Sequence, residues 1–231
     1  MITMRPAAER GHANHGWLDS NFSFSFAEYY DPRHMGFRAL RVINEDFVAP
    51  GTGFGKHPHK DMEIFTYVLE GAVKHEDTTG ASETLVPGEL QHMTAGTGVR
   101  HSEMNPSASE TLHLLQIWLI PNKVSATPKY EQKRFAVQDE PNKLHLLASL
   151  DGREGSFTVQ TDAELSAARL DAGGSVTHTF QLGNGWLQVA RGTVTVAGAT
   201  LTAGDGLQLE GEKTVTVSSE DGGEFLLFDL K

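Results

Sequence analysis

Two histidine-containing segments in the first half of the chain carry the side chains best suited to metal chemistry. The first segment reads His57-Pro-His59-Lys-Asp-Met-Glu63, and the second reads Gly96-Thr-Gly-Val-Arg-His101-Ser-Glu103-Met-Asn105. Alternate residues of a strand lie on the same face, so His57 is grouped with His59, and His101 with Glu103. If the two strands are neighbours in one sheet or barrel, the four donor groups converge.

These donor groups predict an open metal site. Three neutral imidazoles and one carboxylate suit a divalent first-row metal such as Fe2+, with Mn, Co, Ni, Cu and Zn as alternatives, and they leave positions for water, substrate or dioxygen. Spacing alone leaves Glu63 as a rival to Glu103, because Glu63 would also face inward if the first strand continued without a bulge. The other strand histidines are interpreted as surface or core residues: His75, His92, His113, His145 and His178.

Composition narrows the chemistry and the partners. The 231 residues include no cysteine, which excludes disulfides, thiolate zinc sites, iron–sulfur clusters and cysteine nucleophiles. The formal net charge of -11 opposes binding to a polyanion, so we expect no direct contact with nucleic acid. The chain contains neither a G-x-S-x-G elbow nor a His-Glu-x-x-His motif, which argues against hydrolase mechanisms.

The chain also lacks the sequence signals of export and membrane insertion. Its opening residues, Met1-Ile-Thr-Met-Arg-Pro, contain no apolar run typical of a signal peptide, and no stretch approaches the roughly 20 apolar residues of a membrane span. We therefore expect a cytoplasmic protein without a membrane contact. We also expect a monomer.

Frequent turn residues between short alternating stretches predict an all-β chain. The sequence contains 24 glycines and 9 prolines, which repeatedly interrupt apolar–polar alternation. Residues 67–75 are predicted to form a hairpin that turns at Glu70-Gly71. Residues 185–198 repeat this plan around Gly192, which predicts a diverged internal repeat.

The seam of that repeat is predicted within residues 121–141, where prolines and charged residues interrupt the strand pattern. We therefore expect one domain at residues 1–134 and a second at residues 135–231. The segment 162–170 fits a helix by propensity and a strand by its β context, and both alternatives stay open.

The two histidine segments resemble the two sequence motifs of cupins. The matching residues are Gly51, His57, His59, Glu63 and Gly71 in the first motif, and Gly96, Gly98, His101 and Asn105 in the second. Gly96 replaces the usual proline, and Gly71 falls one residue later than the commonest spacing. Further segments within about residues 8 to 134 narrow the resemblance to the pirin family, especially its bacterial quercetin 2,3-dioxygenase members: His15-Gly-Trp-Leu-Asp-Ser20, Tyr29-Tyr-Asp-Pro32, Met35-Gly-Phe and Leu40-Arg-Val-Ile-Asn44.

The resemblance implies a bicupin, with two face-to-face β-barrels and a metal only in the N-terminal one. The pirin ligands correspond to His57, His59, His101 and Glu103, while Glu63 is not expected to contact the metal. The counterpart region of the C-terminal half, residues 174–182, offers a single histidine, so a second metal site would lack ligands. The resemblance therefore favours Glu103 over Glu63 as the fourth ligand, a choice that the spacing leaves open.

The same resemblance implies an activity. Pirin-like members cleave flavonols such as quercetin with dioxygen, so we expect a metal-dependent dioxygenase in which Glu103 is either a ligand alone or also the general base. The alternative is a non-enzymatic, iron-binding pirin that acts as a redox-sensitive regulator through a protein partner. A storage or isomerase cupin is a weaker alternative. Candidates for an apolar slot that holds a flat substrate are Phe24, Phe26, Phe54, Met93 and Trp118.

Overall fold

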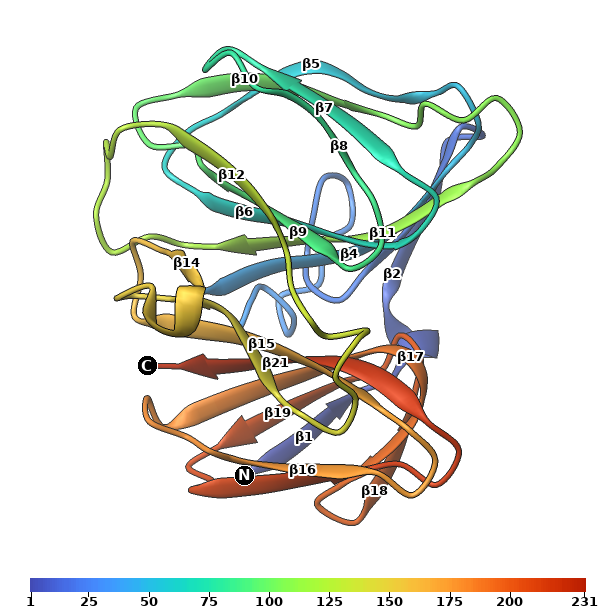
Figure 1. The fold of residues 1–231 in the computed structure, drawn as a ribbon, viewed down its shortest axis with the longest axis vertical. Helices are drawn as coiled ribbons and strands as arrows, with labels where there is room; N and C mark the ends of the chain where they lie inside the picture. Colours follow the sequence, from blue (N-terminus) through green and yellow to red (C-terminus); the bar gives the residue numbers. More distant parts are fainter. The chain divides into compact units, whose positions relative to one another are not determined.

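The computed structural model describes residues 1–231, and strands make up nearly all of its regular structure (Figure 1). The prediction of an all-β chain is confirmed. Contacts divide the chain into two compact units, each described by itself. The N-terminal unit comprises Gly11–Gly36 and Leu40–Arg134, and the C-terminal unit comprises Met1–Arg10, Phe37–Ala39 and Phe135–Lys231.

The N-terminal unit contains two antiparallel sheets. One has seven strands in the order β12-β9-β6-β11-β4-β3-β2, and the other has four in the order β5-β10-β7-β8. The strands of this unit are β2 (Gly11–Asn14), β3 (Leu18–Phe22), β4 (Leu40–Val48), β5 (Gly53–His59), β6 (Glu63–Glu70), β7 (Val73–Asp77), β8 (Ser82–Leu85), β9 (Glu89–Thr94), β10 (Val99–Met104), β11 (Leu112–Leu119) and β12 (Lys129–Arg134).

The C-terminal unit contains one ten-stranded network. Its main path is β1-β19-β17-β21-β15-β13-β14, and β16, β18 and β20 join it through β17. The elements of this unit are β1 (Ile2–Arg5), β13 (His145–Ser149), β14 (Phe157–Thr158), β15 (Ala163–Leu170), β16 (Ser175–Thr179), β17 (Asn184–Val196), β18 (Ala199–Thr202), β19 (Gly206–Glu210), β20 (Thr214–Ser218), β21 (Gly223–Leu230) and the 3-10 helices η1 (Ala7–Glu9) and η2 (Arg153–Gly155).

The first residues of the chain pack far from their neighbours in sequence. Strand β1 pairs with β19, so Met1–Arg10 lies in the C-terminal unit, as Figure 1 shows by the blue strand among the orange and red ones. The expected domains, 1–134 and 135–231, stay a prediction, because a grouping of contacts does not test which segments fold on their own.

The hairpin predicted for residues 67–75 is wrong. Strand β6 pairs with β9 and β11, whereas β7 pairs with β8 and β10, so the chain passes from one sheet to the other after Glu70 instead of folding back on itself. The positions of the two strands along the sequence could not reveal this, because a crossing and a hairpin both require an interruption at Gly71.

The second predicted hairpin, around Gly192, is also wrong. Strand β17 runs without a break from Asn184 to Val196 and changes partners at Gly192, from β19 and β21 to β18 and β20. Gly192 has φ +67°, and a side chain there would place its Cβ 2.4 Å from the Gly222 carbonyl oxygen. Glycine therefore permits a bend where two backbones touch.

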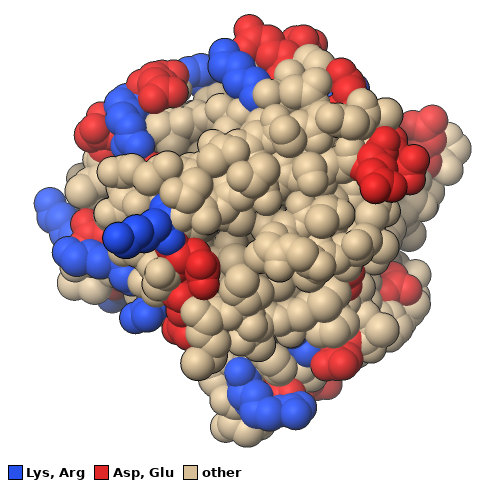
Figure 2. Space-filling model, turned by 90° about the horizontal axis from the view of Figure 1, so that it is seen from below, with Lys and Arg blue, Asp and Glu red and all other residues tan.

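The ambiguous segment 162–170 forms strand β15 over Ala163–Leu170. Leu165 and Leu170 are both buried, so packing in the sheet overrides the helical propensity of the alanines. No helix of the structure has the length and hydrophobicity needed to cross a bilayer. Figure 2 shows one face of the molecule, on which acidic and basic side chains lie toward the rim and mostly uncharged residues cover the centre.

Candidate metal centre and cavity

Strands β5 and β10 of the N-terminal unit bring the two histidine segments together. They are antiparallel neighbours, with His57 directly opposite His101 and His59 opposite Val99. His57 and His59 are half-buried, while His101 and Glu103 are buried. The two strands are therefore neighbours in one sheet, which is the condition under which the donor groups were expected to converge.

A β-bulge sets which side chains of β5 point inward. Between His101 and Glu103 the partner residue changes from His57 to Phe54, so β5 contains one residue more than β10 at this place. Phe54 and His57 both line the same cavity, although strict alternation would place them on opposite faces. The bulge thus adds an aromatic wall beside the histidines.

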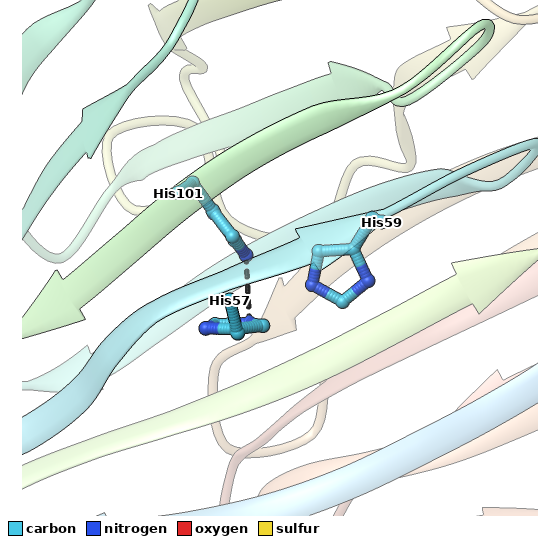
Figure 3. Close-up of side chains that lie close together, drawn as sticks. All are labelled: His57, His59 and His101. Carbon is cyan, nitrogen blue, oxygen red and sulfur yellow. Dashed lines mark hydrogen bonds between the residues drawn. The ribbon is translucent and has the colours of Figure 1, made fainter.

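The three imidazole groups meet in one cluster (Figure 3). The Nε2 atoms of His57 and His101 are 3.0 Å apart. One ring nitrogen from each of His57, His59 and His101 lies within 4.8 Å of the others. The His59 ring also packs edge-on against Trp118, with ring centroids 4.9 Å apart.

Hydrogen bonds behind the cluster fix the proton positions on two of these rings. His57 Nδ1 lies 2.7 Å from the Gly55 carbonyl oxygen. A carbonyl oxygen only accepts, so Nδ1 carries the hydrogen and donates it. A neutral His57 ring therefore presents a lone pair at Nε2, toward His101.

A second chain of contacts fixes the His101 ring. His101 Nδ1 lies 3.4 Å from His75 Nδ1, and His75 Nε2 lies 2.9 Å from Asp77 Oδ2. Desolvation raises the pKa of Asp77, but hydrogen bonds from His75 and Thr79 outweigh it and lower the pKa, so the carboxylate accepts. A neutral His75 ring therefore donates from Nε2 and accepts at Nδ1, and in that arrangement His101 donates from Nδ1 and keeps a lone pair at Nε2.

With all three rings neutral, the lone pairs of His57 Nε2 and His101 Nε2 face each other at 3.0 Å. Burial lowers the pKa of both His59 and His101 to about 4, so these rings are neutral near pH 7. Two nitrogens that bind one ion at about 2.1 Å and at right angles to each other lie about 3.0 Å apart. The cluster could therefore hold a divalent metal, which would turn the repulsion between lone pairs into two bonds.

Glu103 lies behind His101, in a second group that contains His75, His101 and Glu103. Its Oε1 accepts hydrogen bonds from Thr66 Oγ1 and Gln91 Nε2, both at 2.9 Å, and its Oε2 accepts one from Gln116 Nε2. Burial raises the pKa of Glu103, but His101, His75 and the hydrogen bonds from Gln91 and Thr66 outweigh it and lower the pKa. The carboxylate is therefore ionised, as a metal ligand must be.

Glu63, the rival ligand, has a different role. Its Oε2 lies 2.6 Å from His92 Nε2 and accepts a hydrogen bond from Thr94 Oγ1 at 3.0 Å. The next residue, Ile64, lines the cavity, so Glu63 points to the opposite face of its sheet. The first segment does not continue as one strand to Glu63, because β5 ends at His59 and β6 begins at Glu63, so the condition for an inward Glu63 is not met.

The imidazole cluster opens into a cavity of about 480 Å³. Eight apolar or aromatic side chains line it, together with four histidines and five other polar side chains. Of the five residues predicted for an apolar slot, Phe26, Phe54 and Trp118 line the cavity, whereas Phe24 and Met93 lie in the core. The other aromatic wall residues are Trp17 and Phe22.

Known proteins share this sequence and this arrangement. The sequence profile of the pirin family matches residues 3–119, and that of the quercetinase C-terminal cupin domain matches residues 146–230. The chain is 52% identical to quercetin 2,3-dioxygenase from Escherichia coli (strain K12), with 100% of this chain and 99% of that protein covered. The chain belongs to the pirin family.

Solved structures agree with the assignment of this pirin to a bicupin fold. The crystal structure of YhhW from Escherichia coli matches with a TM-score of 0.95 and 50% identity, over 100% of this chain and 98% of that one. A structure of the bacterial pirin YhhW in complex with nickel(II) matches with a TM-score of 0.94 and 50% identity, over 100% and 99% of the two chains. The predicted fold class, all-β with two cupin domains, is confirmed.

The C-terminal unit of this pirin has no comparable group. His178 lies on β16, 3.4 Å from Asp229 Oδ2, and that carboxylate also accepts hydrogen bonds from the backbone of Gln181 and Leu182. The only other histidine of this unit is His145, which contacts the Glu140 carbonyl oxygen. No cluster of three donor side chains occurs here.

Sequence reasoning missed two parts of the site. It treated His75 as an ordinary residue, although the His75-x-Asp77 spacing places both side chains on one face of a strand. It also did not select Asn44 and Asp46, which line the cavity from β4. Burial raises the pKa of Asp46 to about 7, and Ser20 Oγ donates a hydrogen bond to it. Polar residues within the apolar pattern of 40–48 were the available signal.

Proposed function

We propose that this pirin is a metal-dependent dioxygenase that cleaves a flavonol such as quercetin with dioxygen. The observation that carries the proposal is the convergence of three histidines, with the Nε2 atoms of His57 and His101 3.0 Å apart, beside an aromatic-walled cavity of about 480 Å³. A cavity of this size suits a small aromatic ligand. Its full-length relative named quercetin 2,3-dioxygenase supports the choice of substrate.

The proposed metal ligands are His57, His59, His101 and Glu103. The three histidine nitrogens already converge, and Glu103 lies within reach of His101 as the fourth donor. Fe2+ is the metal we favour, with Mn, Co, Ni, Cu and Zn as alternatives that the same donor types accept. When bound, the metal acts as a Lewis acid that lowers the pKa of a flavonol hydroxyl.

The remaining steps use side chains of the protein. Trp118 and the other aromatic wall residues hold the flat rings and exclude water from the reacting carbon atoms. Glu103 is proposed as the base that accepts the proton of the flavonol hydroxyl at a carboxylate oxygen, a role that typically contributes about 10² to 10⁴ in rate. Thr66, Gln91 and Gln116 orient that carboxylate through their hydrogen bonds.

The decisive experiment compares quercetin consumption with and without dioxygen in metal-loaded protein. Turnover with matching oxygen uptake, and none under argon, supports the dioxygenase. Tight binding of quercetin without turnover under either atmosphere would contradict the dioxygenase. It would favour the regulatory alternative, in which a protein partner binds according to the redox state of the metal site. Metal analysis of protein purified from its own source identifies the metal. The further expectations are a monomer and a cytoplasmic location.

A further inference from the structure

The sheet opposite the histidines contributes a polar row to the cavity. Ser20 on β3, Asn44 and Asp46 on β4, and Gln116 on β11 all line it and are all buried. The strand register places Asn44 directly opposite Gln116, and Ser20 directly opposite Asp46. These four side chains therefore form one continuous polar strip within an otherwise largely apolar wall.

Three members of this strip have partners, and one does not. Ser20 Oγ donates to Asp46, and Gln116 Nε2 donates to Glu103. Asn44 Oδ1 is buried without any hydrogen-bond partner, although Asn44 is only 4% exposed. No other cavity-lining residue has a buried side-chain polar atom without a hydrogen-bond partner. Such an atom destabilises the fold, so its presence needs a reason.

The position of Asn44 supplies a reason. Side chains directly opposite each other on antiparallel strands have Cβ atoms about 4.5 to 5.5 Å apart. The Asn44 amide therefore stands beside Gln116, whose own amide reaches Glu103. A ligand bound near the imidazole cluster would bring its next substituent close to Asn44.

We propose that Asn44 is a specificity-determining residue whose Oδ1 accepts a hydrogen bond from a second hydroxyl of the substrate, apart from the hydroxyl bound at the metal. A carbonyl oxygen only accepts, so the matching group is an O–H and not a ring ether or a ketone oxygen. This inference rests on the proposed function and narrows it to polyhydroxylated flavonols. A site that offers a buried acceptor rejects an analogue that lacks the hydroxyl.

The test measures binding, without turnover, of flavonols that each lack one hydroxyl of quercetin. Dissociation constants come from quenching of tryptophan fluorescence under argon, since Trp17 and Trp118 line the cavity. The wild-type protein should bind quercetin about ten-fold tighter than one of the analogues. The hydroxyl that this analogue lacks is the one bound by Asn44. In Asn44→Leu, affinity for quercetin should fall to that of this analogue, whose own affinity should be unchanged.

Two further variants separate recognition from a structural role. Asn44→Leu should raise the melting temperature, because it removes an unpartnered buried oxygen. Thr161→Val, which removes another unpartnered buried oxygen in the C-terminal unit, should raise the melting temperature and leave every dissociation constant unchanged. Asn44→Asp keeps an acceptor oxygen at the same position and should keep the preference for quercetin over the analogue.

The outcomes distinguish the inference from the function on which it rests. Equal losses for all flavonols in Asn44→Leu, or a preference that persists in this variant, overturn the inference alone. Failure of the wild-type protein to bind any flavonol overturns the inference and the proposed function together.

Discussion

The two units of this pirin share an all-strand plan and differ in what fills their interiors. Both contain a point, after Glu70 in one and at Gly192 in the other, where the chain passes from one set of strand partners to another. The C-terminal unit buries one apolar cluster of fourteen residues. The N-terminal unit has clusters of seven and four residues besides other buried apolar side chains such as Phe65 and Ile43, and it also buries His75, His101 and Glu103.

This difference shows that an interior with ionisable side chains needs a partner for each of them. Buried ionisable groups destabilise a fold unless each one finds a partner, and the N-terminal unit provides these partners through chains such as His101–His75–Asp77. The C-terminal unit buries mainly aliphatic and aromatic side chains, whose burial stabilises the fold without needing partners. One cupin can therefore provide chemistry, while the other provides mostly stability.

The largest expected effect is the loss of the metal in His101→Ala. This change removes one of the two facing lone pairs and the central member of the cluster, so metal content and oxygen-dependent quercetin turnover should both disappear. Elemental analysis and oxygen uptake measure the two quantities. The matched variant His178→Ala, in the C-terminal unit, should keep both. Full metal stoichiometry in His101→Ala would contradict the ligand assignment.

The next effect is on stability and concerns the apolar interior. Phe225 is completely buried in the C-terminal cluster, so Phe225→Ala should lower the free energy of unfolding by about 3 to 5 kcal/mol. Urea denaturation followed by tryptophan fluorescence measures the change. The folded variant should bind as much metal as the wild-type protein at 25 °C. Loss of metal from the folded protein would show that the division of roles between the units is incorrect.

A smaller effect is expected from His75, which holds the His101 ring by accepting its Nδ1 hydrogen. His75→Leu removes this acceptor and should weaken metal binding by about 10- to 100-fold, as is typical when the partner of a ligating histidine is lost. Competition with a chelator measures the affinity.

Two companion variants make the His75 experiment specific. His75→Gln has a side-chain oxygen that can accept the same hydrogen, so it should recover part of the affinity. His113→Leu, which removes a histidine paired with Glu45 in the same unit, should have wild-type affinity. Equal metal affinity of His75→Leu and the wild-type protein would contradict the proposed chain of hydrogen bonds from Asp77 to the metal.

The smallest effect is a pH dependence of stability from the cluster that contains Glu63. Burial lowers the pKa of His92, but hydrogen bonds to Glu131 and Glu63 outweigh it and raise the pKa above its usual value. A raised folded-state pKa gives stability that is fully present below about pH 6.5 and is lost as the pH rises through the folded-state pKa. His92→Gln should flatten this decline, which we expect to be on the order of 1 kcal/mol. Urea midpoints between pH 6 and 9 measure it, and an unchanged slope would refute the pairing.

The sequence contained enough information to predict the all-β character and which side chains of each histidine segment share a face, because both follow from local periodicity. Alternation places His57 and His59 on one face, and the two-residue spacing of His101 and Glu103 does the same. The resemblance to pirins then favoured Glu103 over Glu63, and the structure places Glu63 beside His92, on the opposite face of its sheet. The ligand set itself stays a prediction.

Pairing between distant strands was beyond the reach of the sequence. The crossing after Glu70 was interpreted as a hairpin, because a glycine interrupts the chain in the same way in both structures. The bulge that turns Phe54 inward and the contact of His75 with His101 depend on strand register, which side chains far apart in the sequence set together.

By itself, the sequence determined the residue types, their spacing and the all-β character of this protein. Only the tertiary structure decided which nitrogens of His57 and His101 face the cluster, which carboxylate stands behind it, and which amide oxygen of the cavity has no partner. The physical reason is that donor and acceptor directions depend on groups brought together from separate strands, and local periodicity contains no information about these groups.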